Sequence, residues 1–210
     1  MNYIEQSTKE KILATSLQMF ATDGYTAVSV RNISNAVGIK ESSIYYHFRN
    51  KEDIFQTILS QAEELMQMKK EIFINALHSV SRIECEKFID TGIAYVENYL
   101  LEDNVHQLIQ MLTIEKQRNK EAASVYHKLL FTAPLEHHKN IFAYMMDKEY
   151  IIADNPEFLA AEYQAIILFI FHKYYSDPDF VSDAIKSKAR QELSFLLKRF
   201  YNRYFSREAQ

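Results

Sequence analysis

Residues 24–53 read GYTAVSVRNISNAVGIKESSIYYHFRNKED, and this stretch decides how the chain folds. Ser29 is a good N-cap, because its hydroxyl can accept a backbone N–H that has no partner within the helix. Apolar residues then recur at helical spacing. Gly38 follows, the residue type with which many helices end in a left-handed turn. The pattern predicts a short helix that closes in a tight turn.

A second short helix is predicted at about residues 41–48. Ile44 and Phe48 are four residues apart and therefore share its buried face. Ser42 and Tyr46 lie on the opposite face. Two short helices joined by a tight turn form a helix-turn-helix. Hydroxyl and aromatic groups on the outer face of its second helix suit contact with phosphates and base edges.

Helices are also predicted on both sides of this motif. Ser7 and Glu10 form a capping box, which begins the preceding helix, and Gly24 ends it. Asn50 caps the following helix, which begins at Lys51 and is expected to reach the seventies. The sequence therefore predicts a three-helix N-terminal unit with a long helix leading out of it.

Three segments of this unit resemble the DNA-binding signature of TetR-family transcriptional regulators: Ser29-Val-Arg-Asn-Ile, Ala36-Val-Gly-Ile and Ile44-Tyr-Tyr-His-Phe-Arg-Asn-Lys-Glu-Asp-Ile. They occur in the order and at the spacing of that family, over about residues 8–60. Beyond this segment the resemblance is architectural. It implies an all-α fold, with a helix-turn-helix DNA-binding domain over 1–52 and a helical regulatory and dimerisation domain over 53–210.

The resemblance also implies which residues contact DNA. Tyr45, Tyr46, His47 and Lys51 match family positions that contact the backbone or thymine methyl groups. Ile44 replaces the usual leucine, and we expect departures of this kind to alter sequence preference more than DNA binding itself. The predicted DNA-binding residues are Ser29, Val30, Arg31, Lys40, Ser42, Ser43, Tyr45, Tyr46, His47 and Lys51.

The charge of the chain does not itself indicate nucleic-acid binding. The formal net charge is −4, and residues 1–54 contain six basic and six acidic side chains. Any affinity for DNA must therefore come from a local basic face. With 48% hydrophobic residues and only 3 Gly and 3 Pro, the chain is suited to long helices around a large core.

Composition also bears on location and chemistry. A single cysteine, Cys85, and the absence of an apolar leader predict a cytoplasmic protein. The longest apolar run, over 165–171, is too short to span a bilayer. His137 and His138 are adjacent, so a helix directs them apart. We predict no metal, no cofactor and no enzymatic activity.

The remaining sequence predicts more helices. Pro134 is expected to kink or break one of them. Asn155-Pro156 and Asp177-Pro178 each place a cap residue before a proline at the first helical position. The predicted helices cover about residues 84–101, 104–117, 122–148, 156–175 and 178–205.

The last two predicted helices bear on assembly. Residues 166–171 are apolar on all sides, and the final helix carries a long apolar stripe. Either both helices are buried within their own domain, or they form a homodimer with the same helices of a second copy, as the family resemblance implies. The residues predicted for the dimer interface are Ile166, Ile170, Leu193, Leu197 and Phe200.

The middle helices hold many large apolar and aromatic side chains. Ordinary core packing accounts for each of them separately. As a group they are also suited to line a cavity for an apolar or aromatic effector, which the family resemblance implies. The predicted lining residues are Phe88, Tyr95, Tyr99, Met111, Glu115, Tyr126, Phe131 and Phe142.

Together these patterns predict a DNA-binding transcriptional regulator, a repressor that a small effector releases from a palindromic operator. Two alternatives stay open. An architectural DNA-binding protein without an effector would have a solid second domain. A helical scaffold for protein interactions without DNA binding is compatible with the balanced charge of residues 1–54. The operator, the effector and the regulated genes do not follow from the sequence.

Overall fold

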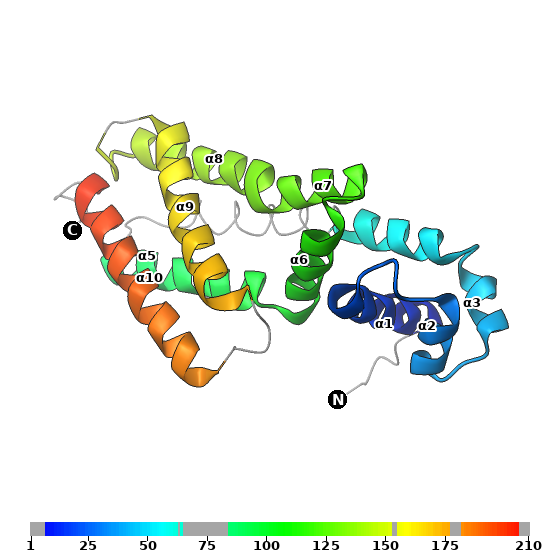
Figure 1. The fold of residues 1–210 in the computed structure, drawn as a ribbon. Coiled ribbons are helices and arrows are strands. Elements are labelled where there is room, and N and C mark those ends of the chain that lie inside the picture. The colour runs from blue at the N-terminus through cyan, green and yellow to red at the C-terminus, as the bar shows by residue number, and fades with distance from the viewer. Residues whose placement is uncertain (1–6, 63, 65–83, 153–154, 177–181, 206–210) are drawn as a thin grey trace. The chain divides into compact units, whose positions relative to one another are not determined.

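The computed structural model describes residues 7–62, 64, 84–152, 155–176 and 182–205. These residues form helices joined by short connections, and the one pairing of extended backbone among them is an isolated bridge between Ile151 and Phe205 (Figure 1). The predicted all-α fold is thus confirmed. None of the described helices is long and apolar enough to cross a membrane.

The chain divides into two compact units. Unit 1 comprises Met1–Met66 and Asp103–His127, and unit 2 comprises Gln67–Glu102 and Lys128–Gln210. The predicted functional division at residues 52 and 53 is a different kind of boundary and stays a prediction. The compact unit that contains the N-terminal segment also contains two helices from residues 103–127.

The elements of unit 1 follow the predicted caps. The side chain of Ser7 accepts the backbone N–H of Glu10, and the carboxylate of Glu10 accepts the backbone N–H of Ser7. Gly24 and Gly38 end two helices with positive φ angles of 79° and 78°, which glycine adopts without a steric penalty. The helices are α1 Thr8–Asp23, α2 Val30–Val37, α3 Glu41–His47, an unlabelled helix over 51–62, α6 Asp103–Glu115 and α7 Lys120–His127.

The core of unit 1 joins the N-terminal helices to α6, which packs against α1. Ile12 and Phe20 of α1 have no exposed surface, and neither do Ile33 of α2 and Ile44 of α3. The Phe20 and Phe55 rings meet edge to face with their centroids 6.1 Å apart. Burial of these side chains stabilises the packing of the helix-turn-helix against the core of unit 1.

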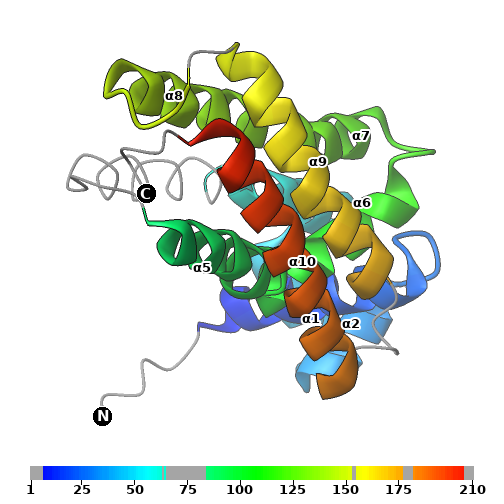
Figure 2. The same cartoon turned by 90° about the vertical axis from the view of Figure 1, so that its left-hand side faces the viewer.

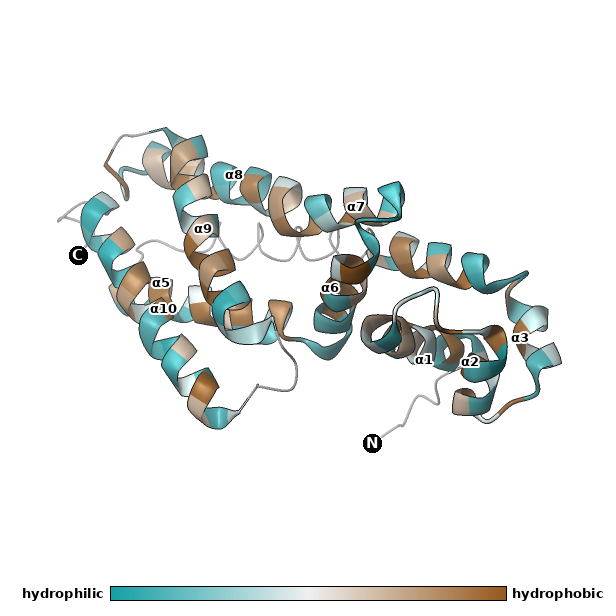
Figure 3. Ribbon diagram, in the orientation of Figure 1, coloured by the Kyte–Doolittle hydropathy of each residue, from teal (hydrophilic) through white to brown (hydrophobic). Residues whose placement is uncertain are grey.

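Unit 2 is built around the long helices α9 and α10, which lie side by side in Figures 1 and 2. Helix α8 packs on α9, and α5 packs on α10. In Figure 3 the middle of α9 is largely hydrophobic, whereas hydrophilic and hydrophobic residues alternate along α10. The elements are α5 Cys85–Tyr95, π-helical η1 Val96–Leu100, π-helical η2 Lys128–Thr132, α8 Ala133–Asp147, α9 Pro156–Tyr175 and α10 Asp183–Tyr204.

Pro134 does not break its helix, so of the two outcomes expected from the sequence, a kink or a break, the break is wrong. Residues 120–147 are helical without interruption, and the five residues of η2 precede Pro134 in the wider π-helical form. A proline lacks the N–H that would bond to the carbonyl four residues earlier, and its ring crowds that carbonyl. The π-helical turn accommodates both effects, so the helix continues.

Two other helix boundaries can be compared with their predictions. Asn155 caps α9 with Pro156 at the first position, as predicted. The final helix begins at Asp183 after the cap Ser182, so the prediction that Asp177-Pro178 begins it is wrong. The hydroxyl of Ser182 accepts the backbone N–H of Ile185 and so caps this helix. The expected extension of the helix from Lys51 into the seventies lies outside the described residues.

Candidate DNA-binding site

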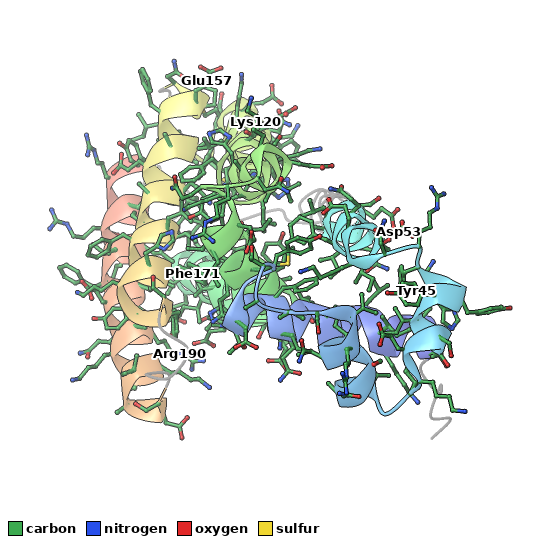
Figure 4. The ribbon with its side chains drawn as sticks, turned by 45° about the vertical axis from the view of Figure 1, so that its right-hand side comes forward. Tyr45, Asp53, Lys120, Glu157, Phe171 and Arg190 are labelled. Atoms are coloured by element: carbon green, nitrogen blue, oxygen red, sulfur yellow. The ribbon has the colours of Figure 1, made fainter. Side chains whose placement is uncertain are left out.

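Helix α3 has one buried face and one strongly exposed face. Ile44 and Phe48 are 0% and 2% exposed, whereas Tyr45 and Tyr46 are 52% and 86% exposed. Figure 4 marks Tyr45 on α3. The helix therefore presents its tyrosines outward, as the spacing predicted.

Local hydrogen bonds fix the beginning of α2 and the turn that joins α2 to α3. The side chain of Ser29 accepts the backbone N–H of Asn32 at 3.1 Å, and the Asn32 amide oxygen accepts the backbone N–H of Ser29 at 2.9 Å. At the other end of α2, Gly38 is left-handed and the N–H of Ile39 donates to the Ser34 carbonyl at 3.0 Å. These contacts lie within a few residues of each other, so they fix the turn by local sequence alone.

The predicted DNA-binding residues fall into two groups. Most lie at the surface around α2 and α3, where a duplex could approach. The exposed residues are Ser29, Arg31, Lys40, Ser42, Tyr45 and Tyr46, and the half-buried residues are Val30, Ser43, His47 and Lys51. The exposed cations Arg31 and Lys40 supply the local basic face that the balanced net charge requires. Contact of each residue with DNA stays a prediction.

Lys51 has a structural role that the sequence did not indicate. Its ammonium donates to the backbone carbonyls of Tyr25 at 2.6 Å and Val28 at 2.7 Å, and it lies 4.1 Å from the centroid of the Tyr25 ring. Burial lowers the pKa of Lys51, and the negative charge of Glu115 partly opposes this. The ammonium thus closes the connection between α1 and α2, and contact of Lys51 with DNA stays a prediction.

Glu115 is the second unexpected residue of unit 1. It lies on α6, is 5% exposed, and accepts the backbone N–H of Tyr25 through Oε1 at 2.9 Å. The Tyr25 hydroxyl donates to Glu52 at 2.8 Å, and burial followed by this hydrogen bond raises the Tyr25 pKa to about 12. Glu115 thus holds the turn that precedes α2. Its assignment to a ligand pocket stays a prediction, while the structure shows a backbone contact with a residue 90 positions away.

The other predicted pocket residues do not form one group. Met111 and Tyr126 belong with Glu115 to unit 1, and the ring of Tyr126 lies 3.7 Å from the Lys116 ammonium. Residues of unit 2 are Phe88, Tyr95, Tyr99, Phe131 and Phe142. None of the predicted residues lines the surface groove of about 390 Å³ between α5 and α10, whose lining is Glu86, Ile89, Asp90, Ser194, Phe195 and Lys198.

The residues predicted for a dimer interface are mostly inside unit 2. Ile170, Leu193, Leu197 and Phe200 are at most 2% exposed, and the Phe200 ring stacks on Phe88 at 5.8 Å. Buried side chains cannot form a surface between subunits, so these four assignments are corrected. Ile166 is half-buried. The exposed large apolar residues on these two helices are instead Phe158, Phe169 and Phe195.

Two buried polar residues of unit 2 were also missed. Gln164 of α9 is 2% exposed and His138 of α8 is 6% exposed. Gln164 falls within the apolar stripe of α9, and a carboxamide at such a position is a detectable departure from pattern. Among the described residues, no cluster of three or more His, Cys, Asp or Glu side chains is arranged to hold a metal ion.

The fold and this site define a class: an all-α helix-turn-helix protein whose second helix exposes tyrosine and hydroxyl groups beside isolated cations. Residues 12–58 match the family model described as bacterial regulatory proteins, tetR family. The chain carries the N-terminal DNA-binding domain of the TetR family of transcriptional regulators, and its similarity to relatives and solved structures of that kind extends beyond this domain. This confirms the resemblance read from the sequence.

Curated relatives extend the match. The biofilm operon icaADBC HTH-type negative transcriptional regulator IcaR of Staphylococcus epidermidis is 40% identical over 48 residues, covering 23% of this chain and 26% of the relative. IcaR of Staphylococcus aureus strain Newman is 23% identical over 158 residues, covering 69% of this chain and 83% of the relative. The strongest identity is thus confined to a short segment.

Solved structures show the same fold along nearly the whole chain. A protein from Mesorhizobium loti described as a TetR-family transcriptional regulator has a TM-score of 0.74 at 15% identity, covering 95% of this chain and 97% of that chain. The SmeT–triclosan complex has a TM-score of 0.69 at 14% identity, and the match covers 98% of this chain and 95% of that chain. The helical arrangement is therefore shared where the sequence is not.

Proposed function

We propose that this protein is a transcriptional repressor that binds a palindromic operator as a homodimer and leaves it when a small effector binds unit 2. The observation that carries DNA recognition is the exposure of Tyr45 and Tyr46 on a helix whose other face is fully buried. Repression is supported by the IcaR relatives, which are named negative regulators.

The exposed faces of α9 and α10 support the homodimer. Phe158 and Phe169 are 71% and 52% exposed and lie eleven residues apart, which returns them to the same side of α9. Phe195 on α10 is 60% exposed. Isolated apolar side chains on a monomer are common, but three phenylalanines on two adjacent helices favour a protein partner. A second copy supplies the two-fold symmetry that a palindrome requires.

Ion pairs hold α9 and α10 together beside these phenylalanines. Lys173 of α9 lies 2.7 Å from Glu192 of α10, and Arg203 of α10 lies 3.8 Å from Glu162 of α9. The pairs are surface-exposed, so each contributes little stability by itself. In the proposed dimer these charged pairs lie at the edge of the interface, because the rim of a protein interface is polar.

An effector is supported by the composition of unit 2 and by one structural neighbour. The interior of unit 2 contains several aromatic rings, among them Phe88, Phe142 and Tyr163. The neighbour SmeT is solved as a complex with triclosan. Effector binding would favour a conformation with lower affinity for the operator, and a coupling of about 1–3 kcal/mol reduces DNA affinity by roughly 5- to 150-fold.

Selection of bound duplexes from a randomised pool tests DNA recognition directly. We expect the recovered sequences to converge on an inverted repeat. Tyr46→Ala should weaken binding to that duplex by about 1–3 kcal/mol without changing thermal stability, since the side chain is 86% exposed. A pool that shows no enrichment at low salt would reject DNA recognition and favour the interaction scaffold.

Static light scattering tests the dimer. Phe169→Glu should shift the protein to monomers, because it places a charge on the proposed interface. Lys188→Glu is the control, because Lys188 is an exposed residue of α10 outside the three phenylalanines and the ion pairs described above. This variant should keep the molecular mass of the unmodified protein in solution. An unmodified protein that is monomeric at micromolar concentration would contradict the proposed homodimer.

A further inference from the structure

Helix α3, the second helix of the helix-turn-helix, begins with an acidic side chain. Glu41 is exposed and lies in the first turn of this helix, four residues before Tyr45. In a helix-turn-helix, the N-terminal residues of the second helix contact base edges in the major groove. A carboxylate at this position brings a negative charge toward a polyanion, so its presence needs a physical reason.

Other acidic side chains of unit 1 have structural partners near the starts of helices. The carboxylate of Glu10 accepts the backbone N–H of Ser7 at 2.7 Å, and that of Asp53 accepts the backbone N–H of Arg49 at 2.9 Å. The carboxylate of Glu41, in contrast, forms no hydrogen bond or ion pair with any residue that the structure describes. Its oxygens are therefore available to accept hydrogen bonds from a bound duplex.

The charges around Glu41 allow DNA to approach while limiting non-specific attraction. Lys40 directly precedes it and is exposed, and Arg31 of α2 is exposed as well. Cations of this kind attract phosphates and supply affinity for any sequence. One carboxylate beside them lowers that general affinity without removing it. Discrimination between sequences then depends more on contacts with the bases.

A carboxylate distinguishes the four bases by what each presents in the major groove. It only accepts hydrogen bonds, and the groove offers two donors, the amino groups at N4 of cytosine and N6 of adenine. Adenine also presents its N7 acceptor beside the donor, whereas guanine and thymine present acceptors without a donor. These acceptors repel a carboxylate. Cytosine presents a donor alone and is the base that suits Glu41.

We propose that Glu41 is a specificity-determining residue, and that it accepts a hydrogen bond from the N4 amino group of one cytosine in each half of the operator. This assignment rests on the proposed function, because it concerns the base preference of the same DNA-binding site. It adds Glu41 to the predicted DNA-binding residues, none of which is acidic. The contact also acts against other sequences, since a carboxylate that faces guanine or thymine loses water without gaining a donor.

A purely structural role for Glu41 leads to a different expectation. A negative charge in the first turn of a helix is favourable, because it interacts with the helix dipole. If that were its only role, Glu41→Gln would change thermal stability but no base preference. Thermal unfolding and base preference, measured on the same variants, therefore separate the two roles.

Selection from a randomised duplex pool, carried out in parallel for three proteins, tests the assignment. The unmodified protein should enrich an inverted repeat with cytosine at one fixed position of each half. Glu41→Gln should enrich the same repeat with adenine at that position, because a carboxamide pairs with N6 and N7 of adenine. Asp23→Asn is the matched control, since it neutralises an exposed carboxylate at the end of α1. This control should enrich the same sequence as the unmodified protein.

A double-mutant cycle between the residue and the base pair then measures the contact. Replacing the cytosine·guanine pair by thymine·adenine should weaken binding of the unmodified protein roughly 5- to 150-fold. The same replacement should change the affinity of Glu41→Ala by less than about 2-fold, because this variant no longer distinguishes the two pairs. Fluorescence anisotropy with labelled duplexes measures the four affinities at one fixed salt concentration, since phosphate contacts make each affinity salt-dependent.

Three results would overturn the assignment. The first is a cytosine preference that persists in both Glu41→Gln and Glu41→Ala, and the second is a Glu41-dependent position at which the unmodified protein prefers another base. Either result leaves DNA recognition intact, because an inverted repeat is still enriched. The third is an unmodified protein that enriches no repeat at all. In that case the proposed function itself fails, and the role of Glu41 fails with it.

Discussion

The helix-turn-helix of unit 1 and the interior of unit 2 differ in how far apart along the chain their polar partners lie. In unit 1, Ser29 pairs with Asn32 and Asn50 accepts the N–H of Asp53, each three residues away. In unit 2, Gln164 reaches Leu130 across 34 residues and Arg190 reaches Glu97 across 93. Unit 1 has long-range contacts as well, but those concern Lys51 and Glu115 rather than the recognition helix itself.

This difference fits the roles proposed for the two units. A recognition helix must meet DNA with a fixed geometry, and local caps provide that geometry wherever the rest of the chain is placed. A regulatory unit must respond to a ligand, and long-range contacts between helices can be rearranged without unfolding any one helix. The comparison predicts that substitutions in the two units will change different measured quantities.

The largest expected effect is at Lys51. Lys51→Ala should lower the free energy of unfolding by about 2–3 kcal/mol, because two carbonyls lose a charged donor. Lys40→Ala, an exposed cation of the same unit, should leave stability unchanged and reduce the salt dependence of DNA binding by about one phosphate contact. Chemical denaturation and salt titrations measure the two quantities. A stable Lys51→Ala protein with a reduced salt slope would favour its interpretation as a phosphate contact.

The next effect depends on pH and belongs to unit 2. The His138 pKa of about 3 is below the ordinary value of 6.5, so protonation favours the unfolded chain. The stability from neutral His138 is complete above about pH 6.5 and is lost as the pH falls toward 3. His138→Phe should therefore lose less stability between pH 7 and pH 5, by about 2 kcal/mol. Identical pH profiles for the two proteins would show that His138 is accessible to protons when folded.

A packing effect of intermediate size is expected at Gly92. A Cβ atom there would lie 2.4 Å from Cδ1 of Leu197 and 3.2 Å from the Tyr163 hydroxyl. Gly92→Val should cost about 1–3 kcal/mol through overpacking between α5 and α10. Gly92→Ala should cost less, because the gain in helix propensity offsets part of the clash. Thermal unfolding of both variants measures this, and no loss in Gly92→Val would mean that α5 and α10 are loosely packed.

The smallest effect is at Ser29, where a local cap is removed. Ser29→Ala should lower the free energy of unfolding by about 1 kcal/mol, the usual contribution of an N-cap. Ser29→Thr retains a hydroxyl and should cost less than Ser29→Ala. Because Ser29 is exposed beside the recognition helix, DNA affinity is measured alongside stability. Equal stability of all three proteins would indicate that the turn is held by its core residues rather than by the cap.

The separation along the chain between hydrogen-bonded residues also explains which features the sequence could predict. The capping residues Ser7 and Asn155 and the left-handed Gly38 were predicted correctly, because each acts on neighbours within one helical turn. Helix α9 begins and ends where its proline cap and apolar run indicated. The outward face of α3 followed from the spacing of Ile44 and Phe48 alone.

The errors and omissions share the opposite property. Glu115 holds a turn 90 residues away, and neither its helix nor its neighbours along the chain indicate this. The apolar stripe of α10 was assigned to a second subunit, although Leu197 is fully buried against its own unit. Periodicity identifies an apolar face but not what covers it. For Gln164 the pattern did contain a signal, since a carboxamide interrupts an otherwise apolar stripe.

The π-helical segment η2 also has a consequence for insertions and deletions. A π-helical turn holds one residue more than an α-helical turn can, so η2 accommodates a single additional residue without ending the helix. Removing the exposed Lys128 would let the helix continue in the narrower form, and the residues on both sides of the deletion would keep nearly the same facing about the helix axis, because the π-helical turn had absorbed the additional residue. Homologous chains that lack one residue here would therefore keep the same buried and exposed faces. Single-residue length changes in this segment are thus a route by which related regulators can vary in length while keeping the same set of helices.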